Sequence, residues 1–537
     1  MPDDRSGETD FDWVIVGSGF GGSVSAFRLA EKGYRVLVLE SGKRWTAEDF
    51  PKSNWNLRKF LWLPKLALHG FFRMKLLDDV LVLGGAGVGG GSLVYANTLL
   101  VPPPQAFERS WPEGHDWRAL LAPHYATAKK MLGVADVPRD FPADTLLKRA
   151  AESMGRGHTF SRTTVGVYFG ESGKKVPDPY FGGSGPDRTG CTFCGGCMTG
   201  CRVGAKNTLD KNYLWLAEQR SAQIWPETKA TTVRALGETG FELEIEASTR
   251  WLRKGRRTIR ARRVVVAAGV LGTVELLLRS KASGALPRLS EQLGRRVRTN
   301  SEAIIGSTAR RRDVDYSEGV AIGSGVYVDD ETHIEAVRYG RGHDALSLLA
   351  TLLTDGEPPV PRFLRWLGQI VRHPIDFVRS LSPFGWARRT VILLTMQTLE
   401  SEMRLLPRRR WFSPFSPTLS STRPEGAARI PTYIKSANDF ARVVARLQDG
   451  FPVSALNEVT LDVPTTAHIL GGCSMGSSAQ DGVIDAKGEV FGHPGLYVLD
   501  GSSIPANLGV NPSLTITAIA EYAMSQLPDK DSLSMIG

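Results

Sequence analysis

Near the N-terminus, the order of apolar and polar positions predicts a strand, a glycine turn, a helix and a second strand. The apolar run Phe11–Val16 has the length of a buried strand, and Ser23–Lys32 has the apolar spacing of a helix. A second apolar run, Arg35–Leu39, ends directly before Glu40. A strand, a glycine turn, a helix, a strand and an acid in this order are typical of a dinucleotide-binding unit.

The glycines of the predicted turn have distinct expected roles. Gly17 permits a tight turn, Gly19 lets the backbone approach a pyrophosphate, and Gly22 allows the helix to pack closely on the strand. The phosphates would then meet the positive end of the helix. Glu40 lies eighteen residues past Gly22, where a carboxylate binds a ribose hydroxyl. An ordinary glycine-rich turn is the alternative, and the agreement among these elements favours the nucleotide site.

A second glycine-rich segment, Gly84–Ser92, is too rich in glycine to form a helix or a strand. It predicts a loop whose bare backbone lies against something flat or anionic, and a flavin is the natural candidate. Gly87, Gly91 and Ser92 are the residues of this loop that we expect to contact the cofactor.

Two later segments are expected to join the same sheet. Arg262–Gly269 has the pattern of a buried strand that ends in small residues, and Leu271–Arg279 has the pattern of a helix. Gly269 is therefore expected beside the cofactor. Gly495–Asp500 predicts another short strand, whose Asp500 would contact the ribityl or phosphate part of a flavin. A structural turn is the alternative role of Asp500.

The C-terminal part of the chain contains an apolar helical segment that follows Asn511 and Pro512. Asparagine is a good helix cap, and proline suits the first helical position. The positive end of this helix, aimed at the flavin ring, would stabilise the negative charge that develops when the flavin takes a hydride. Asn511 and Pro512 are therefore expected in the cofactor site, and a simple helix cap is the alternative role of Asn511.

The composition suits a large enzyme with many loops, since the 537 residues are 42% hydrophobic and include 57 glycines. The net charge of +10 does not come from one basic tail, so it argues only weakly for an anionic membrane or nucleic acid and equally fits scattered surface arginines. No nucleic-acid partner is expected. The start of the chain is polar and lacks the pattern of an export signal, and no apolar run reaches eighteen residues. A cytoplasmic location is the expectation.

Two segments, Phe60–Met74 and Val360–Arg389, mix bulky apolar residues with basic ones. The second contains six arginines and one acid, Asp376. Basic amphipathic segments of this kind lie in the headgroup layer of membranes. The alternative is that both segments are lids packed over the entrance of the active site. Either interpretation indicates an apolar substrate, and the first predicts peripheral contact with a membrane surface.

Four of the five cysteines, Cys191, Cys194, Cys197 and Cys201, have the spacing C-x2-C-x2-C-x3-C. This spacing matches the run that holds an iron–sulfur cluster in bacterial ferredoxins, although Arg202 stands where those proteins usually have proline. Neighbouring glycines favour a backbone that wraps around a metal. A zinc or other structural site, and reduced or disulfide-bonded thiols, are the alternatives. A cluster would make the enzyme a dehydrogenase with an external electron acceptor.

These motifs together resemble the glucose-methanol-choline (GMC) oxidoreductase family, in particular its cholesterol oxidase-like bacterial branch. The resemblance spans nearly the whole chain. Besides the motifs above, it includes Ala467–Cys473, which contains His468, and Asp500–Pro505 together with Gly509–Pro512. The cysteine run and the lack of an export signal depart from the well-known secreted members of that branch.

The resemblance implies a fold of the α/β class (α+β) with two domains. A discontinuous Rossmann-like FAD-binding domain is expected over residues 11–105, 190–300 and 460–530. The insertions, residues 106–189 and 301–459, are expected to form a substrate domain of antiparallel sheet and helices.

The resemblance also implies the catalytic residues. His468 matches the histidine that accepts or positions the proton of the substrate hydroxyl, and an ordinary histidine pKa of about 6.5 suits reversible proton transfer. Asn511 matches the asparagine that orients the substrate oxygen at the flavin edge. Glu335, within Thr332–Val337, is similar to the glutamate that shifts a double bond, where a carboxylate in an apolar pocket carries a proton between carbons. A surface strand is the alternative for this segment.

The sequence therefore predicts an FAD-dependent oxidoreductase that oxidises the hydroxyl group of a hydrophobic alcohol to a ketone or an aldehyde. A sterol, a terpenoid and a long-chain alcohol are the expected substrate types. The hydride would pass to the flavin, and an iron–sulfur cluster would pass the electrons on. Redox-neutral or reductive enone chemistry at the same site is one alternative. A membrane-associated electron carrier, in which His468 performs no substrate chemistry, is another.

Overall fold

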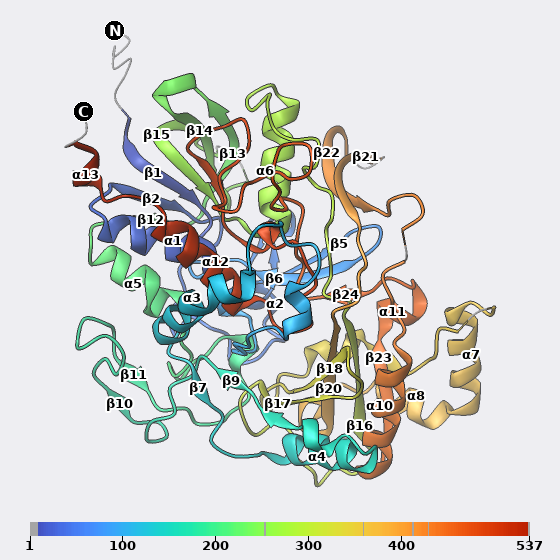
Figure 1. Ribbon diagram of the computed structural model, residues 1–537. Coiled ribbons are helices and arrows are strands. Elements are labelled where there is room, and N and C mark those ends of the chain that lie inside the picture. Colours follow the sequence, from blue (N-terminus) through green and yellow to red (C-terminus); the bar gives the residue numbers. More distant parts are fainter. Residues whose placement is uncertain (1–8, 252–253, 358, 411–412, 428, 535–537) are drawn as a thin grey trace.

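The computed structural model describes residues 9–251, 254–357, 359–410, 413–427 and 429–534. Segments that are far apart in the chain meet in one seven-stranded sheet (Figure 1). Its strands are β1 (Phe11–Val16), β2 (Val36–Leu39), β12 (Gln223–Trp225), β13 (Thr228–Ala235), β14 (Phe241–Ala247), β15 (Arg257–Val266) and β25 (Leu496–Val498). β12, β2, β1, β15 and β25 pair in parallel, and β14 and β13 extend the sheet with antiparallel pairs.

The predicted order of strand, glycine turn, helix and strand is confirmed. β1 has the predicted bounds, and its apolar side chains Trp13, Val14 and Ile15 are fully buried. Helix α1 (Phe20–Glu31) begins directly after the glycine turn. It packs against α5 (Tyr213–Glu218) and α12 (Ser513–Ser525), whereas α6 (Gly269–Ala282) packs against β13 (Figure 1). The parallel strands and their helices therefore form the Rossmann-like part of an α/β fold.

Two helix starts differ from the predictions. Gly269 is the first residue of α6 and not the last residue of a strand, because β15 ends at Val266. Its φ of +72° is one that glycine adopts without strain. α12 begins at Ser513, so Pro512 occupies the position before the helix and not the first helical position. The capping prediction for Asn511 is wrong as well, since no side chain caps α12.

A second sheet of seven strands is antiparallel throughout, in the order β19-β23-β16-β20-β18-β17-β8. Its strands are β8 (Ser161–Arg162), β16 (Ala303–Ala309), β17 (Ile322–Tyr327), β18 (Thr332–Val337), β19 (Ala350–Leu352), β20 (Thr390–Gln397) and β23 (Gly450–Ala455). Helices α4 (Pro142–Ser153) and α10 (Lys435–Leu447) share an apolar core with it. The antiparallel sheet with helices is confirmed, and the domain bounds stay a prediction.

A small three-stranded sheet brings the second glycine-rich segment close to His468. It contains β5 (Phe72–Leu76), β6 (Leu81–Gly85) and β24 (Thr465–Thr466), and β24 is parallel to β6. The prediction that Gly84–Ser92 is entirely loop is wrong at both ends. The first two glycines complete β6 because their backbones pair with β5, and Gly90–Leu93 form a 3-10 turn.

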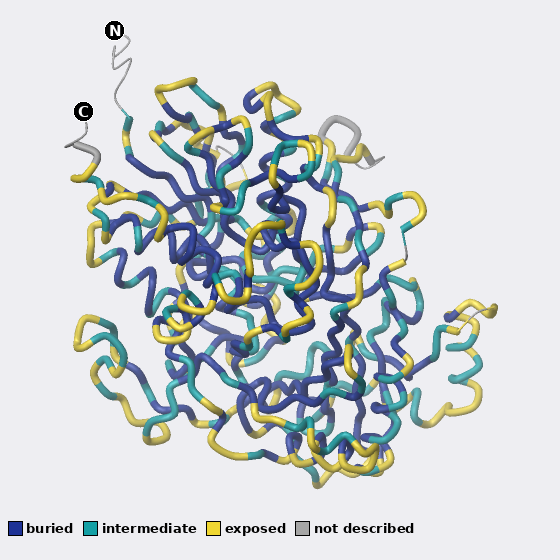
Figure 2. The backbone as a smooth tube through the Cα atoms, viewed as in Figure 1, coloured by how far each residue is buried: buried dark blue, intermediate teal, exposed yellow. Residues whose placement is uncertain are grey.

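The two amphipathic segments fold differently. Residues 60–74 form the short strands β3 (Trp62–Leu63), β4 (Leu68–His69) and β5 around a buried aromatic cluster. Residues 360–389 form α7 (Arg362–Arg372), α8 (Pro374–Ser380) and α9 (Trp386–Arg389). α7 and α8 lie at the edge of the molecule, where most of the backbone tube belongs to exposed or intermediate residues (Figures 1 and 2). No helix in the described part of the chain is long and apolar enough to cross a membrane.

Candidate active site

The turn between β1 and α1 places its glycines in two kinds of surroundings. A side-chain carbon on Gly17 would lie 2.2 Å from the carbonyl oxygen of Ala267, and one on Gly22 would lie 2.0 Å from that of Gly17. Protein packing alone therefore requires glycine at both positions. A carbon on Gly19 would meet nothing within 4 Å, so the space beside the N-terminal end of α1 is open. An anionic group fits there, as the predicted pyrophosphate requires.

Glu40 lies between the two glycine-rich segments and is buried. One of its carboxylate oxygens accepts hydrogen bonds from the backbone amide and the hydroxyl of Ser18, at 3.2 and 2.7 Å. The other oxygen accepts the backbone amides of Gly42 at 2.8 Å and of Gly87 at 3.3 Å. The structure thereby brings Glu40 and Gly87 together, and contact of Glu40 with a ribose stays a prediction.

Gly91 and Ser92 lie where the two glycine-rich segments touch. A side-chain carbon on Gly90 would lie 2.7 Å from the Cα of Gly19. At Gly91 such a carbon would lie 3.8 Å from the ring of Phe20, which is an ordinary packing distance. The hydroxyl of Ser92 accepts the backbone amide of Leu209 at 3.1 Å, which braces the turn. Gly91 and Ser92 thus follow the residue that touches Gly19, and their contact with the cofactor stays a prediction.

Asp500 lies at the start of α6, close to Gly269. Its carboxylate accepts the hydroxyl of Thr273 at 2.5 Å and the backbone amide of Ser502 at 2.8 Å. Burial raises the pKa of Asp500, and its hydrogen bonds oppose that rise. These contacts match the structural-turn alternative, while contact of Asp500 with the cofactor stays a prediction.

Several buried polar atoms near the second glycine-rich segment have no hydrogen-bond partner among the described residues. They are both amide atoms of Asn97, the hydroxyl of Thr98 and Oδ1 of Asp210. A carbon on Gly89 would lie 3.6 Å from that oxygen of Asp210. Because buried polar groups are nearly always hydrogen-bonded, these atoms indicate a polar ligand. The open space beside Gly19 and the unpartnered atoms fit a dinucleotide such as FAD.

His468 and Glu302 form a buried pair. His468 follows β24, and Glu302 directly precedes β16. One carboxylate oxygen of Glu302 contacts Nδ1 of His468, and the other accepts the backbone amide of Ala467 at 2.7 Å. The side chain of Glu302 is fully buried, whereas that of His468 is 14% exposed. Since Nδ1 is held by the carboxylate, Nε2 is the ring nitrogen that remains for a substrate.

The surroundings of His468 make it a stronger proton acceptor than an ordinary histidine. Burial by itself lowers the pKa of His468, but the charge and hydrogen bond of Glu302 and the charge of Glu335 outweigh burial and raise the pKa above its ordinary value. The pair therefore stabilises the imidazolium that forms once His468 has taken a proton.

Glu335 in β18 and Asn511 before α12 are 176 residues apart in the chain and meet in the core. Nδ2 of Asn511 donates a hydrogen bond to Oε2 of Glu335 at 3.1 Å. The amide nitrogen of Asn511 therefore binds a residue of a distant strand. Every residue of β18 is buried and Glu335 has no exposed surface, so the surface-strand alternative is wrong.

Each of these two side chains has one atom without a partner. Oε1 of Glu335 and Oδ1 of Asn511 are buried and accept no hydrogen bond from the described residues. Burial raises the pKa of Glu335 to about 7, against the opposing effects of the Asn511 hydrogen bond and the charge of His468. A carboxyl group of this kind exchanges its proton near neutral pH, which suits proton transfer. We call His468, Glu302, Asn511 and Glu335 the active-site row.

Sequence reasoning missed Glu302 and the turn that positions it. Asn300 and Ser301 have left-handed backbone conformations, with φ of 60° and 45°. The Oδ1 atom of Asn300 accepts the backbone amides of Leu508 and Gly509 at 3.0 and 2.8 Å, which fixes the loop before α12. Strained residues of this kind persist where the surroundings hold them in place. Asparagine tolerates the left-handed region, so Asn300, two residues before Glu302, was the one weak signal for this turn in the sequence.

Comparisons with known proteins agree with this geometry. Family models described as GMC oxidoreductase match residues 185–298 and 454–520, and a model of an NAD(P)-binding Rossmann-like domain matches residues 15–47. A "Cholesterol oxidase" of Acinetobacter baumannii is 49% identical over 98% of this chain and 95% of that protein. A "Cholesterol oxidase" of Mycobacterium tuberculosis (strain H37Rv) is 47% identical over 97% of this chain and 92% of that protein. The chain belongs to the GMC oxidoreductase family.

More distant relatives of this GMC oxidoreductase extend the comparison. A "Long-chain-alcohol oxidase" of Arabidopsis thaliana is 26% identical over 96% of this chain and 67% of that protein. The solved structure of pyridoxine 4-oxidase from "Mesorbium loti" matches with a TM-score of 0.62 at 17% identity, covering 96% of this chain and 98% of that one. The latter supports the fold alone. The family and its cholesterol oxidase-like members confirm the prediction of an FAD-dependent oxidoreductase that acts on CH–OH donors.

Four clustered cysteines of this GMC oxidoreductase line one cavity, which we call the cysteine pocket. Cys191 and Cys197 are buried, Cys201 is partly buried and Cys194 is exposed. All four are free thiols in the structure, so the disulfide alternative is not supported. The backbone amide of Phe193 donates to the sulfur of Cys191 at 3.4 Å. The pocket thus extends from the protein interior to its surface.

Lys206 connects the cysteine pocket with the second glycine-rich segment. Its buried ammonium group donates to the carbonyl oxygens of Leu93, Tyr95 and Cys197 at 3.1, 2.9 and 2.8 Å. Burial lowers the pKa of Lys206 to about 7, and the neighbouring thiols oppose that change. Because Leu93 directly follows Ser92, the cysteine pocket lies next to the predicted flavin site.

Among the residues that the structure describes, no three histidine, cysteine, aspartate or glutamate side chains are placed to hold a single metal ion. The zinc alternative therefore lacks a converging set of ligands. An iron–sulfur cluster has a different requirement, because its cysteines bind separate irons and surround the cluster. Cys473 is fully buried in the main core, as expected of a residue that binds no metal.

Proposed function

We propose that this GMC oxidoreductase oxidises the hydroxyl group of a hydrophobic alcohol to a ketone or an aldehyde, with sterols as the foremost substrate class. The observation that carries the proposal is the buried pair of His468 and Glu302, which leaves one ring nitrogen for a hydroxyl group. Relatives named cholesterol oxidase and long-chain-alcohol oxidase act, by their names, on alcohols of this kind. Terpenoid and long-chain alcohols are further members of the class.

His468 is the proposed general base of the reaction. Its Nε2 accepts the proton of the substrate hydroxyl, while Glu302 holds Nδ1 and fixes the orientation of the ring. The carboxylate also stabilises the positive charge that the ring acquires. Glu302 acts through His468, so it is a positioning residue.

Asn511 is proposed to position the substrate oxygen. Its Nδ2 is held by Glu335, and its unpartnered Oδ1 is free to accept a hydrogen bond from the substrate or the cofactor. FAD, when bound, supplies the acceptor for the hydride of the carbinol carbon. The residues proposed to hold FAD are Gly17, Gly19, Gly22, Glu40, Gly87, Gly91, Ser92, Gly269, Asp500, Asn511 and Pro512.

Glu335 is proposed to carry a proton in a second step, when the product is a ketone with a double bond at the β,γ position. The carboxylate removes a proton from the carbon between the carbonyl group and the double bond. The resulting carboxylic acid returns that proton to the far carbon of the former double bond, and the conjugated enone forms without redox change. The unpartnered Oε1 and the raised pKa of Glu335 suit this role.

We also propose that Cys191, Cys194, Cys197 and Cys201 hold an iron–sulfur cluster. The support is the ferredoxin-like spacing, the free thiols that line one cavity, and the position of Lys206 between this cavity and the flavin site. A bound cluster would supply a route for electrons to an external acceptor at the exposed Cys194 side.

Metal analysis tests the cluster without reference to activity. Protein purified without oxygen should contain iron and acid-labile sulfide in matching amounts, and a Cys197→Ala variant should lose both. A Cys473→Ala variant, which changes a buried thiol outside the cysteine pocket, should keep them. Fresh anaerobic wild-type protein without iron would refute the cluster.

The substrate class is tested with the purified flavoprotein and a panel of alcohols. A 3β-hydroxysteroid, a terpenoid alcohol and a long-chain primary alcohol would be incubated with the enzyme and an electron acceptor, and the carbonyl products identified by mass spectrometry. The proposal predicts product from at least one of these and none from glucose or glycerol. Turnover of the polar alcohols alone would contradict it.

Since substrates of this class dissolve in lipid, we also propose peripheral contact with a membrane.

A further inference from the structure

The helices α7 and α8 and the turn after them expose an unusual amount of apolar surface. Eight large apolar side chains in this stretch are between 43% and 84% exposed. They are Phe363, Leu364, Leu367, Val371, Ile375, Val378, Leu381 and Phe384. Residues four apart share a face of a helix, so Phe363, Leu367 and Val371 form one continuous row along α7. Large exposed apolar patches mark surfaces that bind a membrane or a partner.

The opposite side of this helical pair is fixed to the protein. The buried guanidinium group of Arg362 donates to the carbonyl oxygens of Thr354 at 2.9 Å and of Glu458 at 3.1 Å. The indole nitrogen of Trp366 donates to the hydroxyl of Thr351 at 2.9 Å. Phe377 packs against a small apolar core beneath α8. The apolar row is therefore presented by helices that are already anchored.

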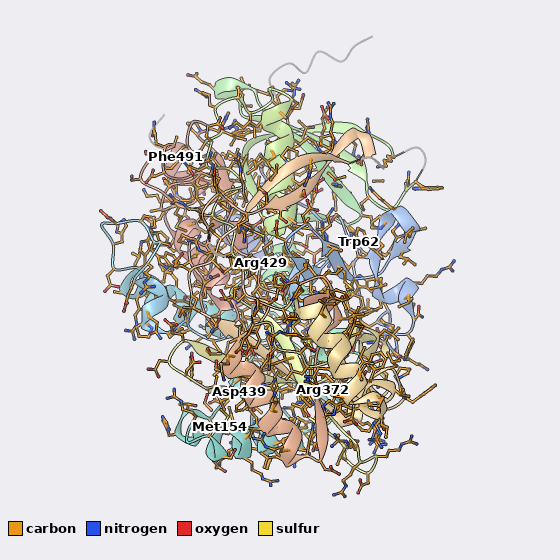
Figure 3. The ribbon with its side chains drawn as sticks, turned by 90° about the vertical axis from the view of Figure 1, so that its right-hand side faces the viewer. Trp62, Met154, Arg372, Arg429, Asp439 and Phe491 are labelled. Carbon is orange, nitrogen blue, oxygen red and sulfur yellow. The ribbon has the colours of Figure 1, made fainter. Side chains whose placement is uncertain are left out.

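Within α7 and α8 the charges beside the exposed apolar surface are mainly positive. The carboxylate of Asp376 is paired with Arg310 at 2.7 Å and with Arg379 at 3.2 Å, so the one acid of the segment is neutralised. Neither Arg365 nor Arg372 has a carboxylate partner within the described ranges of the chain. Arg372 lies on the side of the molecule that faces the viewer in Figure 3, at the end of α7.

We propose that α7 and α8 form a docking surface for a bilayer that contains anionic phospholipids. The apolar side chains would enter the boundary between headgroups and acyl chains, and Arg365 and Arg372 would meet the phosphates. A second copy of the chain fits less well, because the two copies would bring the same positive charges together. Anionic headgroups complement these charges.

The docking surface is connected to the active-site row through one buried residue, Glu458. The backbone carbonyl of Glu458 accepts a hydrogen bond from Arg362 of α7 at 3.1 Å. The side chain of Glu458 accepts the backbone amides of Ile304 and Thr465 at 3.2 and 3.3 Å. These residues lie two positions after Glu302 and three before His468. The same residue, Glu458, therefore contacts both the anchor of α7 and the segments that carry Glu302 and His468.

Vesicle flotation with the full-length flavoprotein tests this surface. The wild-type protein should float with vesicles of phosphatidylcholine and phosphatidylglycerol, and less with phosphatidylcholine alone. A triple variant, Phe363→Ser, Val371→Ser and Phe384→Ser, should bind the anionic vesicles weaker by about tenfold or more, since it removes exposed apolar anchors. A double variant, Arg365→Gln and Arg372→Gln, should lose the preference for anionic vesicles.

Two controls keep the result separate from catalysis and folding. A Leu461→Ser variant changes a side chain that is also exposed but lies outside α7 and α8, and it should float like the wild type. All variants should oxidise a detergent-solubilised alcohol at the wild-type rate, so failure of the proposed reaction would leave the vesicle result unaffected. Equal flotation of the triple variant would overturn the proposal. A different result would show that the surface binds a second copy of the chain. In that case the wild type would not bind vesicles and would form a concentration-dependent dimer, and the triple variant would not form it.

Discussion

The active-site row and the cysteine pocket both lie beside the second glycine-rich segment, yet their side chains suit different chemistry. The row contains two carboxyl groups, an imidazole and an amide, and two of its buried oxygen atoms lack a partner among the described residues. The pocket contains four free thiols and Lys206, whose ammonium group donates three hydrogen bonds. Oxygen and nitrogen groups near neutral pKa move protons, whereas thiolates bind soft metals. A substitution in one of the two sites should therefore leave the function of the other site intact.

Replacing His468 should have the largest effect on the reduction of the flavin by an alcohol. In His468→Gln the general base is lost, so the rate should fall by about 10²–10⁴-fold. Stopped-flow absorbance under anaerobic conditions measures this rate, and iron content should be unchanged. His373→Gln, at an exposed position between α7 and α8, is the matched control. A His468→Gln enzyme with a near-normal rate would mean that the row does not contain the base.

Glu302→Gln should have the next largest effect. The amide of glutamine can present an N–H group to Nδ1 of His468, which would place the ring proton on Nε2 and block proton uptake. We expect the rate of flavin reduction to fall by roughly 10–100-fold and to recover in part in Glu302→Asp. The pKa of His468 in the pH profile should decrease, since the carboxylate raises it. An unchanged pH profile would contradict the positioning role.

Glu335→Gln should separate two activities. The isomerisation of a β,γ-unsaturated ketone should be lost, because glutamine cannot carry a proton, while alcohol oxidation changes by less than about tenfold. Product analysis by chromatography should show the unconjugated ketone accumulating. Glu331→Gln, an exposed position on the same hairpin, serves as control. Equal loss of both activities would indicate that Glu335 mainly holds Asn511 in place.

The wild-type isomerisation should depend on pH in a defined direction. Burial raises the pKa of Glu335 to about 7, so the carboxyl group is protonated below that pH and ionised above it. Because the first proton transfer requires the carboxylate, the rate should increase as pH rises through about 7 and then level off. Rates measured with the preformed unconjugated ketone avoid any contribution of the oxidation step. A rate that falls over this range would assign the opposite protonation state to Glu335.

Cys197→Ala should have the smallest effect on flavin reduction, within about twofold of wild type, since the pocket takes no part in proton transfer. Turnover with a one-electron acceptor should fall, while turnover with oxygen should remain. Comparison of these two turnover rates, with Cys473→Ala as control, measures the separation of the sites. A large loss of flavin reduction in Cys197→Ala would contradict the separate roles of the active-site row and the cysteine pocket.

The nucleotide-binding unit was predictable because its signals are local. The bounds of β1 follow from one apolar run, and α1 starts where the glycine turn ends. In contrast, the role of Glu302 depends on a contact with His468 that spans 166 residues of chain. The contact of Asn511 with Glu335 likewise joins residues that are 176 positions apart, which no local pattern predicts.

The two amphipathic segments show a further limit of sequence reasoning. Both mix bulky apolar and basic residues, so composition does not distinguish them. In residues 60–74 the aromatic side chains Phe60, Phe71 and Phe72 pack on one another and are buried. In α7 and α8 most of the large apolar side chains are exposed, whereas Trp366 and Phe377 contact the protein beneath. Only the tertiary contacts decide which segment is packed and which is exposed.

The most direct test of the account is anaerobic mixing of the oxidised flavoprotein with a 3β-hydroxysteroid. The account predicts that the flavin absorbance is bleached, that one ketone forms per flavin reduced, and that His468→Gln slows the bleaching without loss of bound flavin. Bleaching at an equal rate in wild type and His468→Gln would contradict the central claim that the active-site row performs the oxidation.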